Sequence, residues 1–143
     1  MGKAANSSIS LKQIHVTDNF WNKYVHLVKD VIIPYQWDIL NDKLEDVETS
    51  HCIENFKIAA GEKEGEFQGA VLQDTDVAKW LEAVGFVLNY ERDEKLEELA
   101  DETIELIGRA QQPDGYLNTY FTIKEPDGRW SNLMEGHELY TAG

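Results

Sequence analysis

The chain has 143 residues, of which 42% are hydrophobic, enough for one compact domain with a sizeable core. Its 27 acidic and 13 basic side chains give a formal net charge of −14, which repels phosphate backbones and anionic lipids, so we expect no nucleic acid and no membrane as partner. No apolar run approaches the roughly 20 residues that span a bilayer, and no secretory signal pattern is present, so we expect a soluble, cytoplasmic protein.

The first part of the chain predicts a leader, a short strand and a helix interrupted by proline. We expect residues 1–8 to be a disordered leader, and the β-branched residues within 9–16 favour a short strand. Thr17 or Asp18 can cap the helix that follows, and Pro34 should break or kink it. The apolar residues of this helix fall on one face: Trp21, Tyr24, Val25, Val28, Val31 and Ile32.

A loop and a short helix should come next. Residues 42–50 are acidic and aperiodic, as is typical of a loop, whereas 51–60 place apolar residues at helical spacing. Gly61 fits the left-handed position that follows many helices, and it opens a glycine-rich connection. Cys52, the only cysteine, can form neither an internal disulfide nor a multi-cysteine metal site in this chain, and we predict a buried, inert thiol.

Residues 73–116 organise the chain as a pair of antiparallel helices. Asp74 or Thr75 can cap the first helix, and Asp93 can cap the second, which a proline and a glycine then stop. The joint between them has about five residues, a length that makes two helices antiparallel neighbours. Their apolar faces contain Val77, Trp80, Leu81, Val84 and Leu88, then Leu96, Leu99, Ala100, Thr103, Ile107 and Ala110.

The C-terminal part mixes aromatic and turn residues. Residues 116–131 predict a long ordered loop or a small β-hairpin, and 132–143 begin another helix. We expect Leu133, Leu139 and Tyr140 in this last helix to lack packing partners. We also expect the helix at 21–32 to cover the face of Trp80.

Few residues suggest chemistry by themselves. His137 and Glu138 begin like the zinc motif His-Glu-x-x-His, but Thr141 stands where the second histidine belongs, and a lone histidine is usually a structural hydrogen bonder. Asp74 and Asp76 could form an acid/base pair or bind a cation, although capping of a helix explains them equally well. No Ser-His-Asp order and no phosphate-binding loop occurs in the sequence.

Sugar binding is a further candidate. The turn at 111–116 combines amide, carboxylate and aromatic groups, which suit the hydroxyls and the ring face of a sugar. Three tryptophans, Trp37, Trp80 and Trp130, could stack on a sugar, but tryptophans at such positions more often belong to the core. These residues hint at a carbohydrate and leave the reaction open.

Six motifs in a fixed order give a family resemblance. They are FW at 20–21, IPYQW at 33–37, NFKIAAGE at 55–62, FxGxxxQDxDxxKWLE at 67–82, IGRAQQPDGYLNTY at 107–120 and HELY at 137–140. Together they make the sequence similar to the N-terminal part of glycoside hydrolase family 127, which contains β-L-arabinofuranosidases. The resemblance covers nearly the whole chain after the leader.

This resemblance implies a mainly all-α fold, in which residues 9–143 form the first part of an (α/α)6 barrel followed by β-sandwich domains. Family members are retaining, exo-acting enzymes with a cysteine nucleophile beside a Zn²⁺ ion held by cysteines and a glutamate, and a separate glutamate as acid/base. All of these residues lie downstream of the HELY motif. We therefore expect no catalytic residue and no zinc ligand in this chain, and Cys52 matches none of them.

One binding residue carries over from the family. The histidine that opens the HELY motif contacts the sugar in the family and matches His137, so we predict His137 as a substrate ligand, with Asp74 and Asp76 as further candidates. The loop between Trp37 and His51 is short, which puts a sugar contact from that loop and the fine substrate preference in doubt.

We interpret the chain as an N-terminal fragment of an enzyme that acts on L-arabinose-containing oligosaccharides. Part of a helical barrel would expose apolar surface, so we expect the isolated chain to be marginally stable or to self-associate, a homodimer being one outcome. Two alternatives are a helical protein-interaction module and a sugar-binding module without catalysis.

Overall fold

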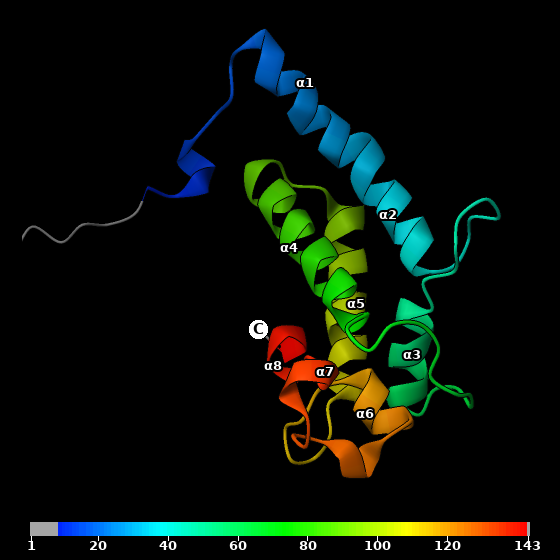
Figure 1. Ribbon diagram of the computed structural model, residues 1–143. Helices are drawn as coiled ribbons and strands as arrows, with labels where there is room; N and C mark the ends of the chain where they lie inside the picture. Colours follow the sequence, from blue (N-terminus) through cyan, green and yellow to red (C-terminus); the bar gives the residue numbers. More distant parts are fainter. Residues whose placement is uncertain (1–8, 143) are drawn as a thin grey trace, which may run out of the picture.

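The computed structural model describes residues 9–142, and every regular element in that range is a helix (Figure 1). The expected mainly α-helical class is thus confirmed, whereas the strand expected at 9–16 and the hairpin considered at 116–131 do not form. The first segment instead holds a short 3-10 helix, Leu11–Gln13, and no strand among the described residues is available to pair with it. The leader predicted at 1–8 lies outside the described residues.

Helices α1 (Asn19–Leu27) and α2 (Ile33–Leu40) form one continuous rod, joined by a π-helical turn, Val28–Ile32 (Figure 1). Pro34 lies in the first turn of α2, and the predicted break of the helix does not occur there. Proline offers no N–H to the preceding turn and its ring crowds that turn. The wider π turn accommodates both effects without ending the rod.

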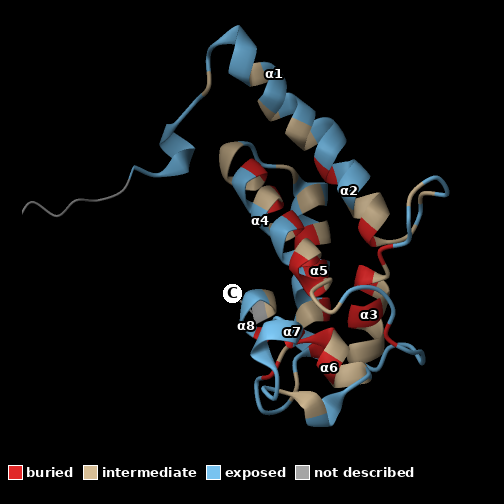
Figure 2. Ribbon diagram, viewed as in Figure 1, coloured by how far each residue is buried: buried red, intermediate tan, exposed pale blue. Residues whose placement is uncertain are grey.

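Helix α1 protrudes from the body of the molecule with its side chains in solvent (Figure 2). Asp18 begins it as predicted, because its carboxylate accepts hydrogen bonds from the N–H groups of Phe20 and Trp21 at 3.0 and 2.8 Å. Trp21 is 61% exposed, and no residue of α1 is buried by the elements that the structure describes. Neither this helix nor any other in the described range is long and apolar enough to cross a membrane.

The core lies between α2, α4 (Asp74–Tyr90) and α5 (Glu94–Ala110). Helices α4 and α5 are antiparallel neighbours, as predicted (Figure 1). Asp93 caps α5, also as predicted, since its carboxylate accepts a hydrogen bond from the N–H of Leu96 at 3.2 Å. The buried apolar side chains of these helices and of α3 (Cys52–Ala59) are Ile33, Leu40, Cys52, Ile53, Phe56, Val77, Trp80, Val84, Val87, Ala100, Leu106 and Ala110.

Trp80 joins α4 to α2. Its indole packs against Trp37 with the ring centroids 4.5 Å apart, and its Nε1 donates a hydrogen bond to the carbonyl of Ile33 at 3.1 Å. We expected the helix at 21–32 to cover this face, and that expectation is wrong. Helix α2 covers it because Ile33 and Trp37, one turn apart, both lie on the side of the rod that meets α4.

Helix α3 (Cys52–Ala59) packs against α5 and α6 (Thr119–Ile123). Gly61 follows it in the left-handed region with φ of 72°, as predicted. Cys52 is completely buried, and its thiol donates a hydrogen bond to the carbonyl of Gln73 at 3.0 Å. Burial, and secondarily the charge of Asp74, raises the pKa of this thiol, which confirms the predicted buried, unreactive cysteine.

Asp74 links α4 to α6 (Thr119–Ile123). It is 7% exposed, and its two carboxylate oxygens accept hydrogen bonds from the backbone N–H and the hydroxyl of Thr119 at 2.7 and 2.5 Å. Burial raises the pKa of Asp74, whereas these two bonds act in the opposite direction. The prediction that Asp74 or Thr75 caps α4 is wrong, because Asp74 turns toward α6 and the hydroxyl of Thr75 donates to the carbonyl of Leu72.

The C-terminal region is a series of short helices. Asn118 starts α6 by accepting a hydrogen bond from the N–H of Phe121 at 3.0 Å, a local contact that replaces the expected hairpin. The helix expected from residue 132 is divided into α7 (Leu133–Gly136) and α8 (Glu138–Ala142). The division falls at His137, which adopts a left-handed conformation with φ of 50°.

Glu138 fastens this region to the body of the protein. It is buried, and its carboxylate accepts hydrogen bonds from the hydroxyl of Tyr116 at 2.5 Å and the N–H of Trp130 at 2.8 Å. Burial and the bond to Glu138 raise the pKa of Tyr116, so its hydroxyl stays a donor. Of the residues expected to lack packing partners, Leu133, Leu139 and Tyr140 are all exposed, but Tyr140 contacts Lys79 of α4.

We predict that Trp80→Ala lowers the free energy of unfolding by about 3–5 kcal/mol, because the change empties a packed site and removes the bond to Ile33. Phe86→Ala on the same helix should change it by less than about 0.5 kcal/mol, since Phe86 is 57% exposed. Urea unfolding of dilute samples measures both values. Equal losses for the two variants would contradict the placement of Trp80 in the core.

A threonine pair tests the link made by Asp74. Thr119→Val should lower the free energy of unfolding by about 1–3 kcal/mol, because it leaves one oxygen of a buried carboxyl without a donor. Thr122→Val is the matched control, since the buried Thr122 hydroxyl has no hydrogen-bond partner within the described residues. We expect this control to be neutral or slightly stabilising in the same unfolding measurement. A neutral Thr119→Val would show that Asp74 does not depend on this hydroxyl.

Candidate functional site

A cavity of about 790 Å³ lies between α2 and α4 and is bordered by the loops that precede α3 and α4. Its apolar wall includes Ile39, Leu40 and Trp80. Its polar side chains are Gln36, Glu48, Thr49, Ser50, Gln73, Asp76 and Lys79. Amide, hydroxyl and charged groups beside an apolar wall are typical of a pocket for a small polar ligand.

Glycine at position 69 lets the two loops meet at the cavity. Gly69 has φ of 94°, a conformation that side-chain-bearing residues rarely adopt. A Cβ atom there would lie 3.3 Å from Oε1 of Gln73 and 3.4 Å from the carbonyl oxygen of Ser50. The absence of a side chain therefore allows the loop before α4 to approach the loop before α3.

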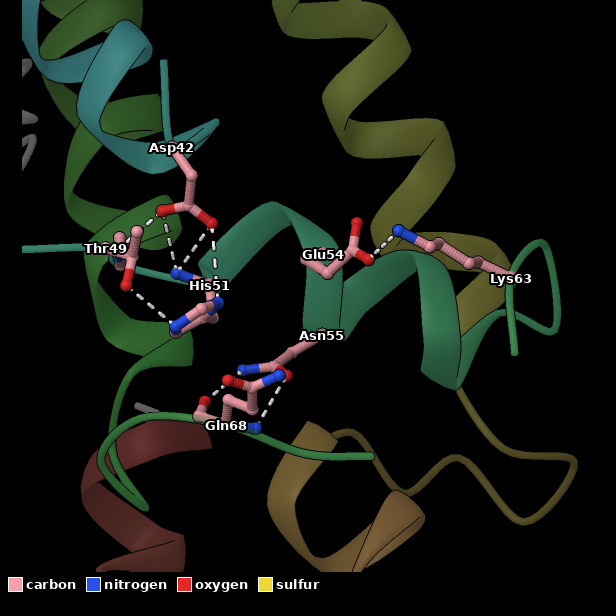
Figure 3. A network of polar contacts seen from close by, with 8 residues as sticks. Asp42, Thr49, His51, Glu54, Asn55, Lys63 and Gln68 are labelled. Carbon is pink, nitrogen blue, oxygen red and sulfur yellow. Dashed lines mark hydrogen bonds and ion pairs between the residues drawn. The ribbon is translucent and has the colours of Figure 1, made fainter. Parts of the chain in front are cut away.

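The glycine-rich connection at 61–69 is fastened to α3 (Figure 3). The buried amide of Asn55 donates to the carbonyl of Gln68 at 2.8 Å and accepts from the N–H of the same residue at 3.2 Å. Lys63 forms an ion pair with Glu54 of α3. These contacts hold the backbone next to Gly69 at the cavity border.

Asp76 and Lys79 face the cavity from the first two turns of α4. The Asp76 carboxylate accepts a hydrogen bond from the Gln73 amide at 3.0 Å, and the Lys79 ammonium lies 3.5 Å from its other oxygen. Lys79 also donates to the hydroxyl of Thr75 at 3.2 Å and lies 5.8 Å from the ring centre of Tyr140 in α8. The sequence-predicted candidate Asp76 is thus at the cavity.

The other two predicted site residues have different positions. Asp74 does not line the cavity; its carboxylate is occupied by Thr119 on the opposite side of α4. His137 is exposed at the turn between α7 and α8, and it too does not line the cavity. Helix α8 packs against α4, and the contact of Tyr140 with Lys79 connects the helix that follows His137 to a residue of the cavity.

Sequence reasoning missed several polar residues of this cavity. Gln36 lies inside the IPYQW motif, which was used only as a family signature, while Thr49 and Ser50 belong to a segment predicted as a plain loop. No periodicity marks loop residues as neighbours of a distant helix. The motif that contains Gln36 could have marked it as a candidate site residue. Nothing in the sequence alone marks the hydroxyls of Thr49 and Ser50 as part of a cavity.

The described residues do not form a zinc site. Among residues 9–142, no group of three or more histidine, cysteine, aspartate or glutamate side chains is arranged to hold a metal ion. Zinc binds thiolate, and the Cys52 thiol is buried, is bonded to a carbonyl and has a raised pKa. Residues 9–142 therefore offer no set of side chains that fits a zinc ion.

Two solved structures resemble this fold closely. The first is a glycoside hydrolase family 127 β-L-arabinofuranosidase from Geobacillus stearothermophilus, with a TM-score of 0.88 and 62% identity over 90% of this chain and 20% of that one. The second is another β-arabinofuranosidase of this family, with a TM-score of 0.80 and 29% identity over 93% of this chain and 21% of that one. The agreement with these structures confirms the helical fold expected from the resemblance.

Sequence comparison gives the same result. A non-reducing end β-L-arabinofuranosidase from Bifidobacterium longum is 38% identical over 146 aligned residues, which cover 91% of this chain and 22% of the relative. The chain thus spans about a fifth of the length of the relatives it matches. Residues 13–143 match the family described as "Beta-L-arabinofuranosidase, GH127 catalytic domain". The chain belongs to glycoside hydrolase family 127.

Proposed function

We propose that this chain is the first part of the catalytic barrel of an enzyme that releases terminal β-L-arabinofuranose from oligosaccharides with retention of configuration. The observation that supports this most directly is the 62% identity, over 90% of the chain, to a β-L-arabinofuranosidase of known structure. The cavity between α2 and α4 has the polar groups and the apolar wall that a pentofuranose requires.

His137 serves as a sugar ligand in this proposal. The side chain is exposed, and its left-handed backbone places it at the junction of α7 and α8. Since α8 packs against α4, the helix that supplies Asp76 and Lys79, a ligand extending from the cavity along α4 could reach this histidine. The imidazole nitrogens can both donate and accept hydrogen bonds with sugar hydroxyls.

The catalytic groups and the zinc ion belong to other residues of the complete enzyme in this proposal. A retaining glycosidase needs a nucleophile and an acid/base on opposite sides of the scissile bond. Cys52 does not suit the first role, because its thiol is buried and its pKa is raised. The contribution of this chain is therefore substrate binding and the framework of the barrel.

The first experiment is an intact-mass measurement on the native polypeptide, with hydrolysis of a β-L-arabinofuranoside and zinc content measured on the same sample. We expect a mass several times 16.4 kDa, release of L-arabinose and bound zinc. A mass near 16.4 kDa without hydrolysis would favour a binding module instead. The exposed face of α1 would then suit a protein-interaction module, and calorimetry with L-arabinose would identify a sugar-binding one.

A substitution at His137 tests its role in the complete enzyme. We predict that His137→Asn lowers kcat/KM for a β-L-arabinofuranoside by about 10- to 100-fold, the effect of one strong hydrogen bond. Asparagine tolerates the left-handed conformation, so the turn between α7 and α8 should persist. Met134→Ala, an exposed change in α7, is the control and should leave kcat/KM within about twofold. Unchanged kinetics of His137→Asn would remove this residue from the site.

A further inference from the structure

The loop between α2 and α3 is closed at its base by Asp42 (Figure 3). The Asp42 carboxylate accepts hydrogen bonds from the N–H of Ser50 at 2.6 Å and from the N–H of His51 at 3.0 and 3.1 Å. One side chain thus joins the two ends of the loop. The backbone at 49–51 is held at the border of the cavity by these bonds.

The same carboxylate lies behind a histidine that contacts a hydroxyl. Nδ1 of His51 is 3.6 Å from Oδ2 of Asp42, and Nε2 is 2.9 Å from Oγ1 of Thr49 (Figure 3). The three side chains therefore follow one another from the base of the loop to the cavity, which Thr49 lines. The contact with His51 restricts the rotation of the Thr49 side chain and so directs its hydroxyl.

The neighbouring residue adds an independent observation. Ser50 lines the cavity and is 8% exposed, and within the described residues its hydroxyl has no hydrogen-bond partner. A buried hydroxyl that makes no bond is unfavourable, and this one adds polar character to the wall of the cavity beside Thr49. Two adjacent hydroxyls, one directed by His51 and one unpartnered, thus lie on the same side of the cavity.

The rest of the cavity wall has complementary groups. Gln36 projects from α2, Asp76 and Lys79 come from α4, and Trp80 supplies apolar surface. A ligand with several hydroxyls can bond Thr49 and these polar groups together, whereas an apolar ligand would remove water from them without bonding them. The chemistry of the cavity therefore fits a sugar.

We propose that Thr49 is a specificity-determining residue that bonds a hydroxyl of the pentofuranosyl substrate, and that Asp42 and His51 are positioning residues for it. This inference rests on the proposed function. The shortness of the loop between Trp37 and His51 put a sugar contact from that loop in doubt. In this proposal the loop still provides a sugar contact, from Thr49. An acid, a histidine and a hydroxyl also form nucleophilic triads, but Asp42 is occupied by two backbone N–H groups and acts here as a clamp.

Kinetics of the complete enzyme test the proposal. Thr49→Val removes the hydroxyl and keeps the shape, and we expect KM for p-nitrophenyl β-L-arabinofuranoside to rise about 3- to 10-fold with kcat within about twofold, since the lost bond is made equally in substrate and transition state. Thr49→Ser restores a hydroxyl and should return KM to within about twofold of the wild type. Thr17→Val, at an exposed threonine that does not line the cavity, is the control.

Deoxy substrates distinguish a sugar contact from a structural effect. The 2-, 3- and 5-deoxy arabinofuranosides are compared on the wild type and on Thr49→Val. With the wild type, one of these deoxy substrates should have a kcat/KM about 3- to 10-fold lower than the parent substrate. With Thr49→Val, the same deoxy substrate and the parent substrate should have almost equal kcat/KM. Asparagine tolerates the left-handed backbone of position 51, so His51→Asn should keep the loop conformation. This variant should reduce the difference between the parent substrate and that one deoxy substrate, and it should leave the kcat/KM ratios of the other two unchanged.

The outcomes separate the two levels of the proposal. If the wild-type enzyme releases arabinose but Thr49→Val leaves KM and the deoxy pattern unchanged, Thr49 is not a ligand and the proposed function stands. If the complete wild-type enzyme hydrolyses no β-L-arabinofuranoside, the proposed function and this inference both fail. If Thr49→Ser behaves like Thr49→Val, the effect comes from the loop structure and overturns the inference.

Discussion

The contact between Trp80 and α2 is the interaction on which the remaining structure depends. The indole fills the space between the two helices and bonds the carbonyl of Ile33, so it fixes how α2 lies on α4. The same residue belongs to the wall of the cavity. Because one side chain serves both the core and the cavity, the distance across the cavity is set by packing, and the polar groups on α2 and α4 face each other in a fixed geometry.

Two carboxylates near the start of α4 show how helix geometry separates structural and binding roles. Residues two apart on an α-helix point about 200° away from each other, so Asp74 and Asp76 cannot face the same side. Asp74 is buried against Thr119 and connects α4 to α6, whereas Asp76 lies at the cavity beside Lys79. Their closeness in sequence first suggested one acid/base pair. The fold instead gives each carboxylate its own set of partners.

Local signals in the sequence predicted the helices well, and contacts between distant segments account for the errors. Asp18 and Asp93 were recognised as caps because capping depends on three or four consecutive residues. Asp74 looks the same locally, but its partner lies 45 residues away. The family motifs likewise predicted the helical fold, and the sugar contact that they suggest for His137 stays a prediction. Thr49 and Ser50 could not be assigned to a cavity, because their position depends on how the loop closes on Asp42.

Three of the four non-glycine residues with positive φ in the described range have a proposed role in binding or positioning, and the fourth is Trp130. Asp42, His51 and His137 have positive φ although none is glycine, and each such residue costs about 1–3 kcal/mol. At the loop, the bonds that Asp42 makes to the backbone offset this cost and hold two left-handed residues together. A loop held in this way loses little further entropy when a ligand binds, because its side chains are already directed. A loop of eleven residues, 41–51, can therefore contribute to recognition without a regular element of its own.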